Sequence, residues 1–302
     1  MPILQLVLAT VFWGVLYSVG KMISPYLPPF ALTLARYGMA SLFLLPFAWR
    51  EFRRIELADV PRLLIVGLLS SLFFNGLLFF GLRFAPAGDS VLAPAIVPIL
   101  TTLLSMVFLG ERPSGAKLTA LAVSVVGVGL VFSSVLQAGG GSGRVTGDLL
   151  ILSAGLSWSA YLLLSAPFSG RYSPLLLTSV TCLAGTVGSL PLAIWEGGLG
   201  RFAGLPGVAW QELLYVSLIG TVGAFTLWSQ GSEAVGAERA AAYMNLVPLC
   251  GLVSSVVLLH EHLGVGQLIG MGLVLLGIWG ATMASRAALR VIRLEGRASA
   301  RL

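Results

Sequence analysis

The side chains in this sequence that could bind a small molecule are few, because only 10% of its 302 residues are charged. Arg36 could attract an anionic group, and the amides of Asn75 and Asn245 could donate and accept hydrogen bonds. The rest of this set combines an aromatic ring with a polar tip: Trp13, Tyr17, Trp158, Tyr161 and Tyr243. The set lacks a nucleophile with a base, paired acids or metal ligands, so it predicts binding and not covalent chemistry.

The spacing of the aromatic residues predicts two walls of a binding cavity. Trp13 and Trp158 both fall near the centre of an apolar stretch, although tryptophan usually lies at the membrane surface. Tyr17 follows Trp13 by one helical turn and Tyr161 follows Trp158 by nearly one turn, so each helix could present an aromatic pair on one face. Aromatic packing between helices is the alternative for these rings. For Arg36, the alternatives are a side chain that reaches the membrane surface and a structural pair.

The elements that carry these residues are predicted to be membrane-spanning helices. The sequence is 57% hydrophobic and 10% charged, whereas soluble domains are about 45–50% apolar and about 25% charged. Ten stretches approach the roughly 20 apolar residues that cross a bilayer as a helix, and none alternates as a barrel strand would. They are residues 4–23, 30–49, 62–82, 88–110, 114–135, 148–166, 173–195, 209–230, 237–259 and 264–285. We therefore predict an all-α membrane protein with ten transmembrane helices.

A repeat divides the chain into two halves. Residues 85–130 recur at residues 235–280 with a constant shift of 150. The shared positions include Val97/Val247, Pro98/Pro248, Leu109/Leu259 and Glu111/Glu261. Each half holds five predicted helices, and this odd number makes the two repeats inverted, an arrangement typical of secondary transporters whose site lies between the repeats. The predicted organisation is a repeat at 1–137, a glycine-rich linker at 138–147, a repeat at 148–285 and a basic tail at 286–302.

Three prolines predict flexible points in the repeated helices. Pro98 and Pro248 fall near the middle of the fourth and ninth stretches, and each removes a helical hydrogen bond. Pro94 adds another break in the fourth stretch. A single proline would indicate an ordinary kink, whereas recurrence in both halves favours hinges beside a cavity.

The lysines and arginines predict the orientation of the chain. With a cytoplasmic amino terminus, thirteen of them lie on the cytoplasmic side, and four lie outside: Lys21, Arg83, Arg144 and Arg201. This positive-inside bias predicts that both termini are cytoplasmic. The arginines of residues 286–302 are spaced to form a basic helical face against anionic lipid headgroups. The charges are dispersed over short loops, so no nucleic-acid partner is predicted.

The sequence has no pattern for a cofactor or a metal. His260, Glu261 and His262 lack the HExxH spacing of zinc sites, and no Gly-Lys-Ser/Thr of a phosphate loop follows the glycine-rich linker. Every Asp and Glu falls at the end of a predicted helix or in a loop, which predicts passive movement of a substrate without a buried proton relay. Gly266 and Gly270, one turn apart, suit close helix packing or a dimer interface, so monomer and homodimer both stay open.

Several motifs of this chain resemble those of a known family. They are Ala85-Pro86-Ala87-Gly88, Val97-Pro98 and Leu109-Gly110-Glu111-Arg112, their echoes Val247-Pro248 and Leu259-His260-Glu261, and Phe12-Trp13-Gly14, Pro28-Pro29-Phe30 and Arg36-Tyr37 near the amino terminus. Over residues 4–285 the chain resembles the EamA-type carriers of the drug/metabolite transporter superfamily. The resemblance implies a ten-helix, inverted-repeat carrier of the bacterial inner membrane, similar to exporters of amino acids and related metabolites. The second half departs from the pattern, because Arg36 has no basic counterpart near residues 178–182 and Ser159 replaces the glycine after the tryptophan.

The residues and the resemblance together predict a secondary exporter that exposes a central cavity alternately to either side of the membrane. Its small-molecule substrates are predicted to be amino acids, including aromatic ones. The first alternative is a nucleotide-sugar or phosphate-ester antiporter of the same superfamily, which needs several basic residues at cavity depth, where only Arg36 is available. A membrane-embedded enzyme and a membrane-embedded structural protein are the alternatives of another class. An enzyme would need catalytic groups within the predicted helices, and the sequence offers none. A purely structural role would not explain why proline interrupts the matching helix in both halves.

Overall fold

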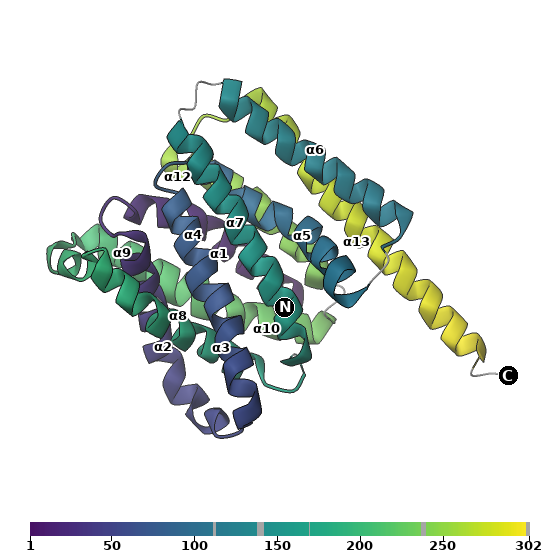
Figure 1. Ribbon diagram of the computed structural model, residues 1–302, viewed down its shortest axis with the longest axis horizontal. Helices are drawn as coiled ribbons and strands as arrows, with labels where there is room; N and C mark the ends of the chain where they lie inside the picture. Colours follow the sequence, from purple (N-terminus) through teal and green to yellow (C-terminus); the bar gives the residue numbers. More distant parts are fainter. Residues whose placement is uncertain (111–112, 138–141, 169, 237–239, 300–302) are drawn as a thin grey trace.

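The computed structural model describes residues 1–110, 113–137, 142–168, 170–236 and 240–299. Within these residues the chain is helical and has no β-strand (Figure 1), so the all-helical part of the predicted fold is confirmed. The α-helices are α1 (Pro2–Ile23), α2 (Pro29–Phe52), α3 (Val60–Leu68), α4 (Phe74–Gly81), α5 (Leu92–Leu109), α6 (Gly115–Gln137), α7 (Ser142–Ser165), α8 (Pro174–Trp195), α9 (Gly207–Leu214), α10 (Ala224–Val235), α12 (Leu246–Leu259) and α13 (Val265–Ser299). The shorter segments of 3₁₀ or π geometry are η1 (Leu57–Asp59), η2 (Leu69–Phe73), η3 (Ala87–Val91), η4 (Ala166–Phe168), η5 (Gly198–Gly204), η6 (Tyr215–Gly223) and η7 (Ala241–Asn245).

Most of the predicted membrane helices are long and apolar enough to cross a bilayer. Seven helices of the described residues meet this condition by length and composition, and the other three predicted stretches contain the shorter apolar helices Ile96–Leu109, Gly115–Val131 and Tyr243–Leu259. Large apolar side chains also lie on the surface, such as Phe108 and Trp195, which are 75% and 82% exposed. An apolar surface of this extent is typical of a protein surrounded by lipid. The chain is a multi-pass membrane protein.

Two of these helices are interrupted by π-helical segments at matching places. η2 separates α3 from α4, and η6 separates α9 from α10. Hydroxyl groups bind backbone carbonyls in both segments: Ser71 Oγ donates to the Gly67 carbonyl at 2.6 Å, and Thr221 Oγ1 donates to the Val216 carbonyl at 2.8 Å. Bulges of this kind are frequent at functional sites, and these two lie beside the site described below.

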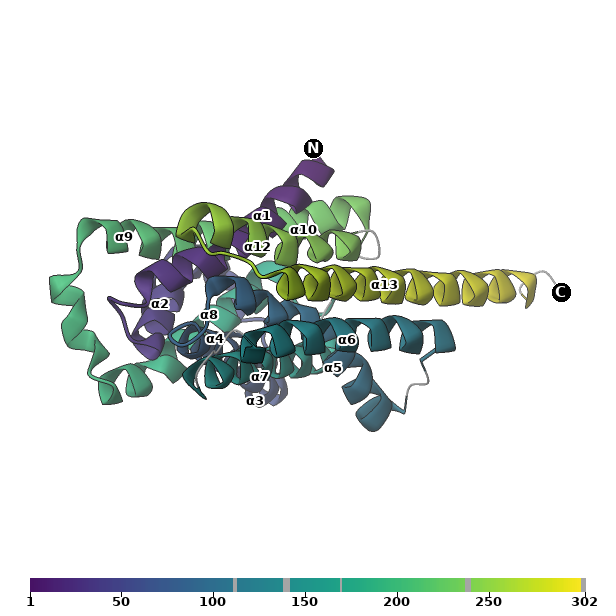
Figure 2. The same cartoon turned by 90° about the horizontal axis from the view of Figure 1, so that it is seen from above.

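The helices pack across the two halves of the sequence in matched pairs. α1 contacts α12 and α10, and α7 contacts α5 and α4 in the same way. α2 packs on α8, and α6 runs along α13 at one edge of the molecule (Figures 1 and 2). Each of these contacts joins an element of the first half to one of the second. The largest buried cluster surrounds α1 and includes Leu16, Ile23, Leu27, Leu78 and Phe79.

Glycines allow α6 and α13 to approach closely. A Cβ at Gly127 would lie 2.5 Å from the Gly270 carbonyl oxygen, and a Cβ at Gly270 would lie 2.7 Å from the Gly127 carbonyl oxygen. Close approach through small residues is typical of helix packing in lipid. Gly270 therefore serves packing within the chain, which is one of its two predicted roles, and its face is not free for a dimer interface.

The linker and the tail differ from the boundaries that the sequence predicts. Residues 142–147 of the predicted linker form the start of α7, and residues 138–141 lie outside the described residues. α13 runs without a break from Val265 to Ser299, so most of the predicted tail continues the last helix beyond the bundle (Figure 2). Alanine, arginine and leucine, which fill much of this tail, are strong helix formers.

Candidate functional site

A buried guanidinium lies between the two interrupted helices. The Arg36 side chain on α2 is 5% exposed. Its Nε donates to Thr221 Oγ1 of η6 at 2.9 Å, and its Nη1 donates to Asn75 Oδ1 of α4. Asn75 Nδ2 donates in turn to the Tyr37 hydroxyl at 2.6 Å and to the Ser70 carbonyl of η2 at 3.2 Å. Arg36 thus joins an element of the first half to one of the second.

Arg36 has no carboxylate partner among the described residues. The ion pairs found in this part of the chain belong to Arg144 and Arg171 instead. Burying a charge is costly unless the charge is paired and hydrogen-bonded, and the neutral oxygens of Asn75 and Thr221 offset only part of that cost. Arg36 Nη2 makes no hydrogen bond to the described residues. A guanidinium binds a carboxylate through two parallel hydrogen bonds, so this group is suited to hold the carboxylate of a ligand.

Aromatic clusters lie on matched helices of the two halves. Trp158 on α7 contacts Phe74, the first residue of α4, with ring centroids 4.9 Å apart. Trp13 on α1 contacts Phe225 and Trp228 of α10, with centroids 5.2 and 5.4 Å apart. Phe74 directly follows η2 and Phe225 lies one residue after the start of α10, which follows η6. Each interrupted helix therefore places an aromatic ring against the tryptophan of the opposite half.

The tyrosines predicted to complete the aromatic walls behave differently in the two halves. Tyr161 contacts Trp158 with ring centroids 4.8 Å apart, as the spacing predicts. Tyr17 is buried, lies within reach of the Arg36 charge, and has no ring contact with Trp13. Trp13 instead contacts the aromatic rings of α10. Tyr17 and Trp13 therefore do not form the ring pair that their spacing predicts.

Two predicted site residues are not connected to Arg36. Tyr243 and Asn245 lie half-buried in η7, and neither makes a side-chain hydrogen bond to the described residues. Thr221, and not Asn245, is the counterpart of Asn75 at the guanidinium. Thr221 follows Asn75 by 146 residues, close to the offset of 145 between the two tryptophans, and this offset is the sequence signal for it. The sequence does not predict Phe74, Thr221, Phe225 and Trp228 as site residues, and Tyr37 is singled out only as part of the family motif Arg36-Tyr37.

The predicted hinge residues occupy two kinds of position. Pro98 lies inside α5, where it removes the hydrogen bond to the Pro94 carbonyl. Pro94 and Pro248 are instead the third residues of α5 and α12, shortly after η3 and η7. The N–H groups of a first helical turn have no intrahelical partner, so Pro248 breaks no hydrogen bond within α12. The irregularity of the ninth predicted stretch is the change from η7 to α12.

A second polar cluster lies where α3 and α8 begin. Arg171 Nη1 pairs with Asp59 Oδ2 at 2.8 Å, and the Tyr172 hydroxyl donates to the same oxygen at 2.6 Å. This hydrogen bond to Asp59 raises the pKa of the Tyr172 hydroxyl, because the carboxylate favours its protonated form. The cluster joins the two halves at this end of the bundle, away from Arg36.

Comparison with known proteins gives consistent matches to transporters. A sequence profile of the EamA-like transporter family matches residues 1–133 and 145–283. The uncharacterized transporter YyaM of Bacillus subtilis is 24% identical over 280 residues, which cover 89% of this chain and 89% of YyaM. A probable terminal-alkyne amino-acid exporter of Streptantibioticus cattleyicolor is 30% identical over 233 residues, which cover 76% of each protein.

A solved structure has a similar fold. This crystal structure aligns with a TM-score of 0.64 and 20% sequence identity, over 94% of this chain and 97% of that one. At this identity the likeness shows the fold alone. The family profile, by contrast, matches most of both halves of the sequence. The chain belongs to the EamA-like transporter family.

Proposed function

We propose that this protein is a secondary exporter that moves small metabolites, aromatic amino acids among them, across the bacterial inner membrane. The site around Arg36 is exposed alternately to either side. One observation carries this proposal: a buried guanidinium without a carboxylate partner among the described residues lies between the interrupted helices of both halves. Family membership supports transport, and the relative named as a probable amino-acid exporter supports the substrate class.

The proposed architecture is ten transmembrane helices in two inverted repeats. Three observations support it: the matched packing of α1 and α7, the π segments in both halves, and the two separate family matches, one for each half. Inverted repeats can rock against each other around a fixed site. Arg36 binds groups of both halves, so it lies where such a motion would change its surroundings.

An amino acid fits the chemistry of this site. Its carboxylate would bind Arg36, and an aromatic side chain would stack against the rings of Trp158 and Phe74 or of Trp13 and Phe225. A phosphate ester or nucleotide sugar carries more negative charge and would need further cations at this depth. Arg36 is the one buried lysine or arginine among the described residues, which favours the single carboxylate.

Transport by purified protein in liposomes tests this proposal. We expect efflux of radiolabelled phenylalanine to be accelerated by unlabelled amino acids outside, but not by phenethylamine or by nucleotide sugars. Acceleration by nucleotide sugars alone would support the antiporter alternative. If the protein accelerates the flux of none of the tested amino acids, the proposal is rejected.

The proposed orientation makes a labelling prediction. Arg53 follows α2 and His262 follows α12, and both are exposed. A cysteine at position 53 is expected to react with an impermeant thiol reagent only from the cytoplasmic side, and a cysteine at position 262 only from outside. Reaction of both positions from the same side of intact cells would be incompatible with the inverted repeats.

The proposed hinge in α5 makes a kinetic prediction. Replacing Pro98 with alanine restores a hydrogen bond and favours a straighter α5, so turnover should fall several-fold while substrate affinity changes little. Initial efflux rates and binding titrations of the same preparation measure the two effects. Pro94→Ala is the matched control, because it changes a first-turn proline of the same helix. Equal turnover of the unchanged protein, Pro98→Ala and Pro94→Ala would show that Pro98 does not act as a hinge.

A further inference from the structure

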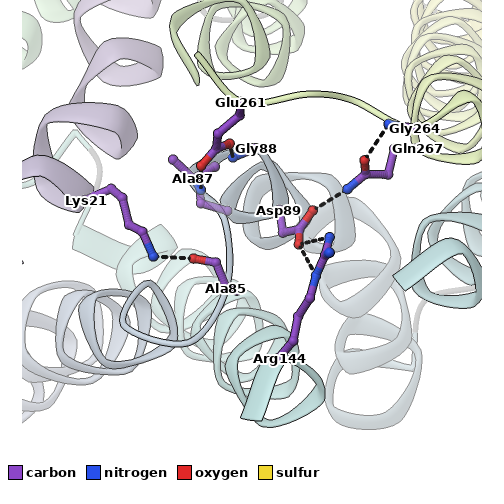
Figure 3. Close-up of polar contacts among 10 residues, drawn as sticks. Lys21, Ala85, Ala87, Gly88, Asp89, Arg144, Glu261, Gly264 and Gln267 are labelled. Carbon is purple, nitrogen blue, oxygen red and sulfur yellow. Dashed lines mark hydrogen bonds and ion pairs between the residues drawn. The ribbon is translucent and has the colours of Figure 1, made fainter. Parts of the chain in front are cut away.

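A polar network closes the end of the bundle where α1 ends and α7 begins (Figure 3). This is the outer end in the proposed orientation. Asp89 of η3 is at its centre, since its Oδ2 pairs with Arg144 Nη2 of α7 at 2.9 Å and its Oδ1 accepts from Gln267 Nε2 of α13 at 2.9 Å. Asp89 itself is 2% exposed. One carboxylate thus joins three elements of the chain.

Two further charged side chains extend this network. Glu261 accepts the backbone N–H groups of Ala87 at 2.7 Å and Gly88 at 2.8 Å, and Lys21 Nζ of α1 donates to the Ala85 carbonyl at 2.7 Å (Figure 3). Groups from both halves therefore hold this end together. In the proposed cycle these contacts must separate for the site to face outward, so we call Lys21, Asp89, Arg144, Glu261 and Gln267 the outer gate.

Asp148 is a second buried carboxyl group beside the gate. It lies one turn after Arg144 on α7, faces Asp89 and is 0% exposed. Neither of its oxygens has a hydrogen-bond partner among the described residues. Two ionised carboxylates in contact repel each other, and neither can donate a hydrogen bond. A single proton on Asp148 would let it donate to Asp89, which keeps the negative charge that Arg144 and Gln267 bind.

We propose that Asp89 and Asp148 share one proton while the outer gate is closed, and that opening of the gate releases this proton to the external water. The inference rests on the alternating access of the proposed function and adds a proton-binding site to it. On opening, the proton passes from an Asp148 carboxyl oxygen to water, which leaves two hydrated, separated carboxylates. The proton returns when the gate closes.

This inference adds a buried proton-binding pair that the sequence does not predict, whereas passive movement of the substrate stays a prediction. Asp89 and Asp148 lie at helix ends, where a sequence gives no sign of burial, but η3, α7 and α13 meet there and exclude water from both groups. Outward opening thereby becomes sensitive to external pH. The other charges near the pair are Arg144 of α7, Lys21 of α1, and Glu261 between α12 and α13.

The sign of the pH effect follows from proton counting. The closed gate holds one proton more than the open gate, so acid favours closure and rising pH favours opening. The ratio of open to closed molecules changes by at most about tenfold per pH unit when one proton is released. Glu261 and Lys21 bind backbone groups in the closed gate, and these bonds do not involve the shared proton. They therefore set the stability of the closed gate and not its pH response.

Spin labels on either side of the outer end can measure this response. Leu199 of η5 and Val265 of α13 are exposed, at 42% and 73%. We would label cysteines at these positions, with Cys182 and Cys250 replaced by alanine, and record electron–electron distances in liposomes from about pH 5.5 to about pH 8.5. We expect the long-distance population to grow with pH in the otherwise unchanged chain. In Asp148→Asn, whose amide donates permanently to Asp89, the gate is expected to stay closed throughout.

Two variants serve as controls. Glu212→Gln neutralises another buried carboxylate, which faces no charged group, and should leave the pH response unchanged. Glu261→Gln weakens the bonds to Ala87 and Gly88 and should lengthen the distances at every pH, which shows that the labels report opening. A pH-independent distance in the unchanged chain, or an undiminished pH response in Asp148→Asn, would overturn the shared proton and leave the transport proposal standing. If Glu261→Gln also changes nothing, outward opening at this end is rejected as well.

Discussion

Replacing Arg36 with glutamine is expected to weaken the binding of amino acids about a hundredfold, which corresponds to about 3 kcal/mol. The substrate carboxylate would lose the charge-assisted hydrogen bonds of the guanidinium. The fold should survive, because the change removes a buried charge that has no carboxylate partner among the described residues. Calorimetric titration of phenylalanine into purified protein measures the effect.

Matched variants and ligands separate this role from a structural one. Arg36→Lys keeps the charge but loses the planar fork, so its affinity should fall between those of the unchanged chain and Arg36→Gln. Arg83→Gln removes an exposed arginine and should have no effect. Phenethylamine lacks a carboxylate, so its weaker binding should not depend on Arg36. Equal losses for phenylalanine and phenethylamine would show that Arg36 acts on the fold and not on the carboxylate.

Replacing Trp13 or Trp158 with alanine is expected to weaken the binding of phenylalanine ten- to hundredfold, or about 1–3 kcal/mol, if a stacked contact is lost. Membrane insertion should be unaffected, because the rings are predicted to line the cavity. The loss should be smaller for the substrate alanine, which has no ring to stack. Trp195→Ala is the control, since this side chain is 82% exposed. If the variants accumulate poorly while the surviving protein binds phenylalanine normally, the rings serve packing between helices.

The sequence predicts the helices well because apolar length is a local property. Each of the ten predicted stretches contains an apolar helix, and seven are long enough to span a membrane by themselves. The interruptions are harder to predict, since η6 contains no proline, and its Thr221 hydroxyl binds the Val216 carbonyl instead. Pro248, the residue chosen from the repeat, lies in the first turn of α12 instead.

The candidate site is predicted residue by residue but not as an arrangement. Arg36 and Asn75 are both chosen from their chemical type, whereas the bond between them depends on how α2 meets α4. The sequence also does not predict that Asp89 and Asp148 are buried together, for a related reason. A carboxylate at a helix end is normally solvated, and only the meeting of η3, α7 and α13 buries this pair.

The alternating exposure of the Arg36 site can be measured directly with a cysteine at Thr221, whose hydroxyl lies 2.9 Å from Arg36 Nε. In a chain with Cys182 and Cys250 replaced by alanine, a small impermeant thiol reagent would be added to vesicles of either orientation. We predict slow labelling from both sides, and slower labelling from both sides when phenylalanine is present. Labelling from one side only, or labelling that phenylalanine does not slow, would contradict a central site that opens alternately to the two sides of the membrane.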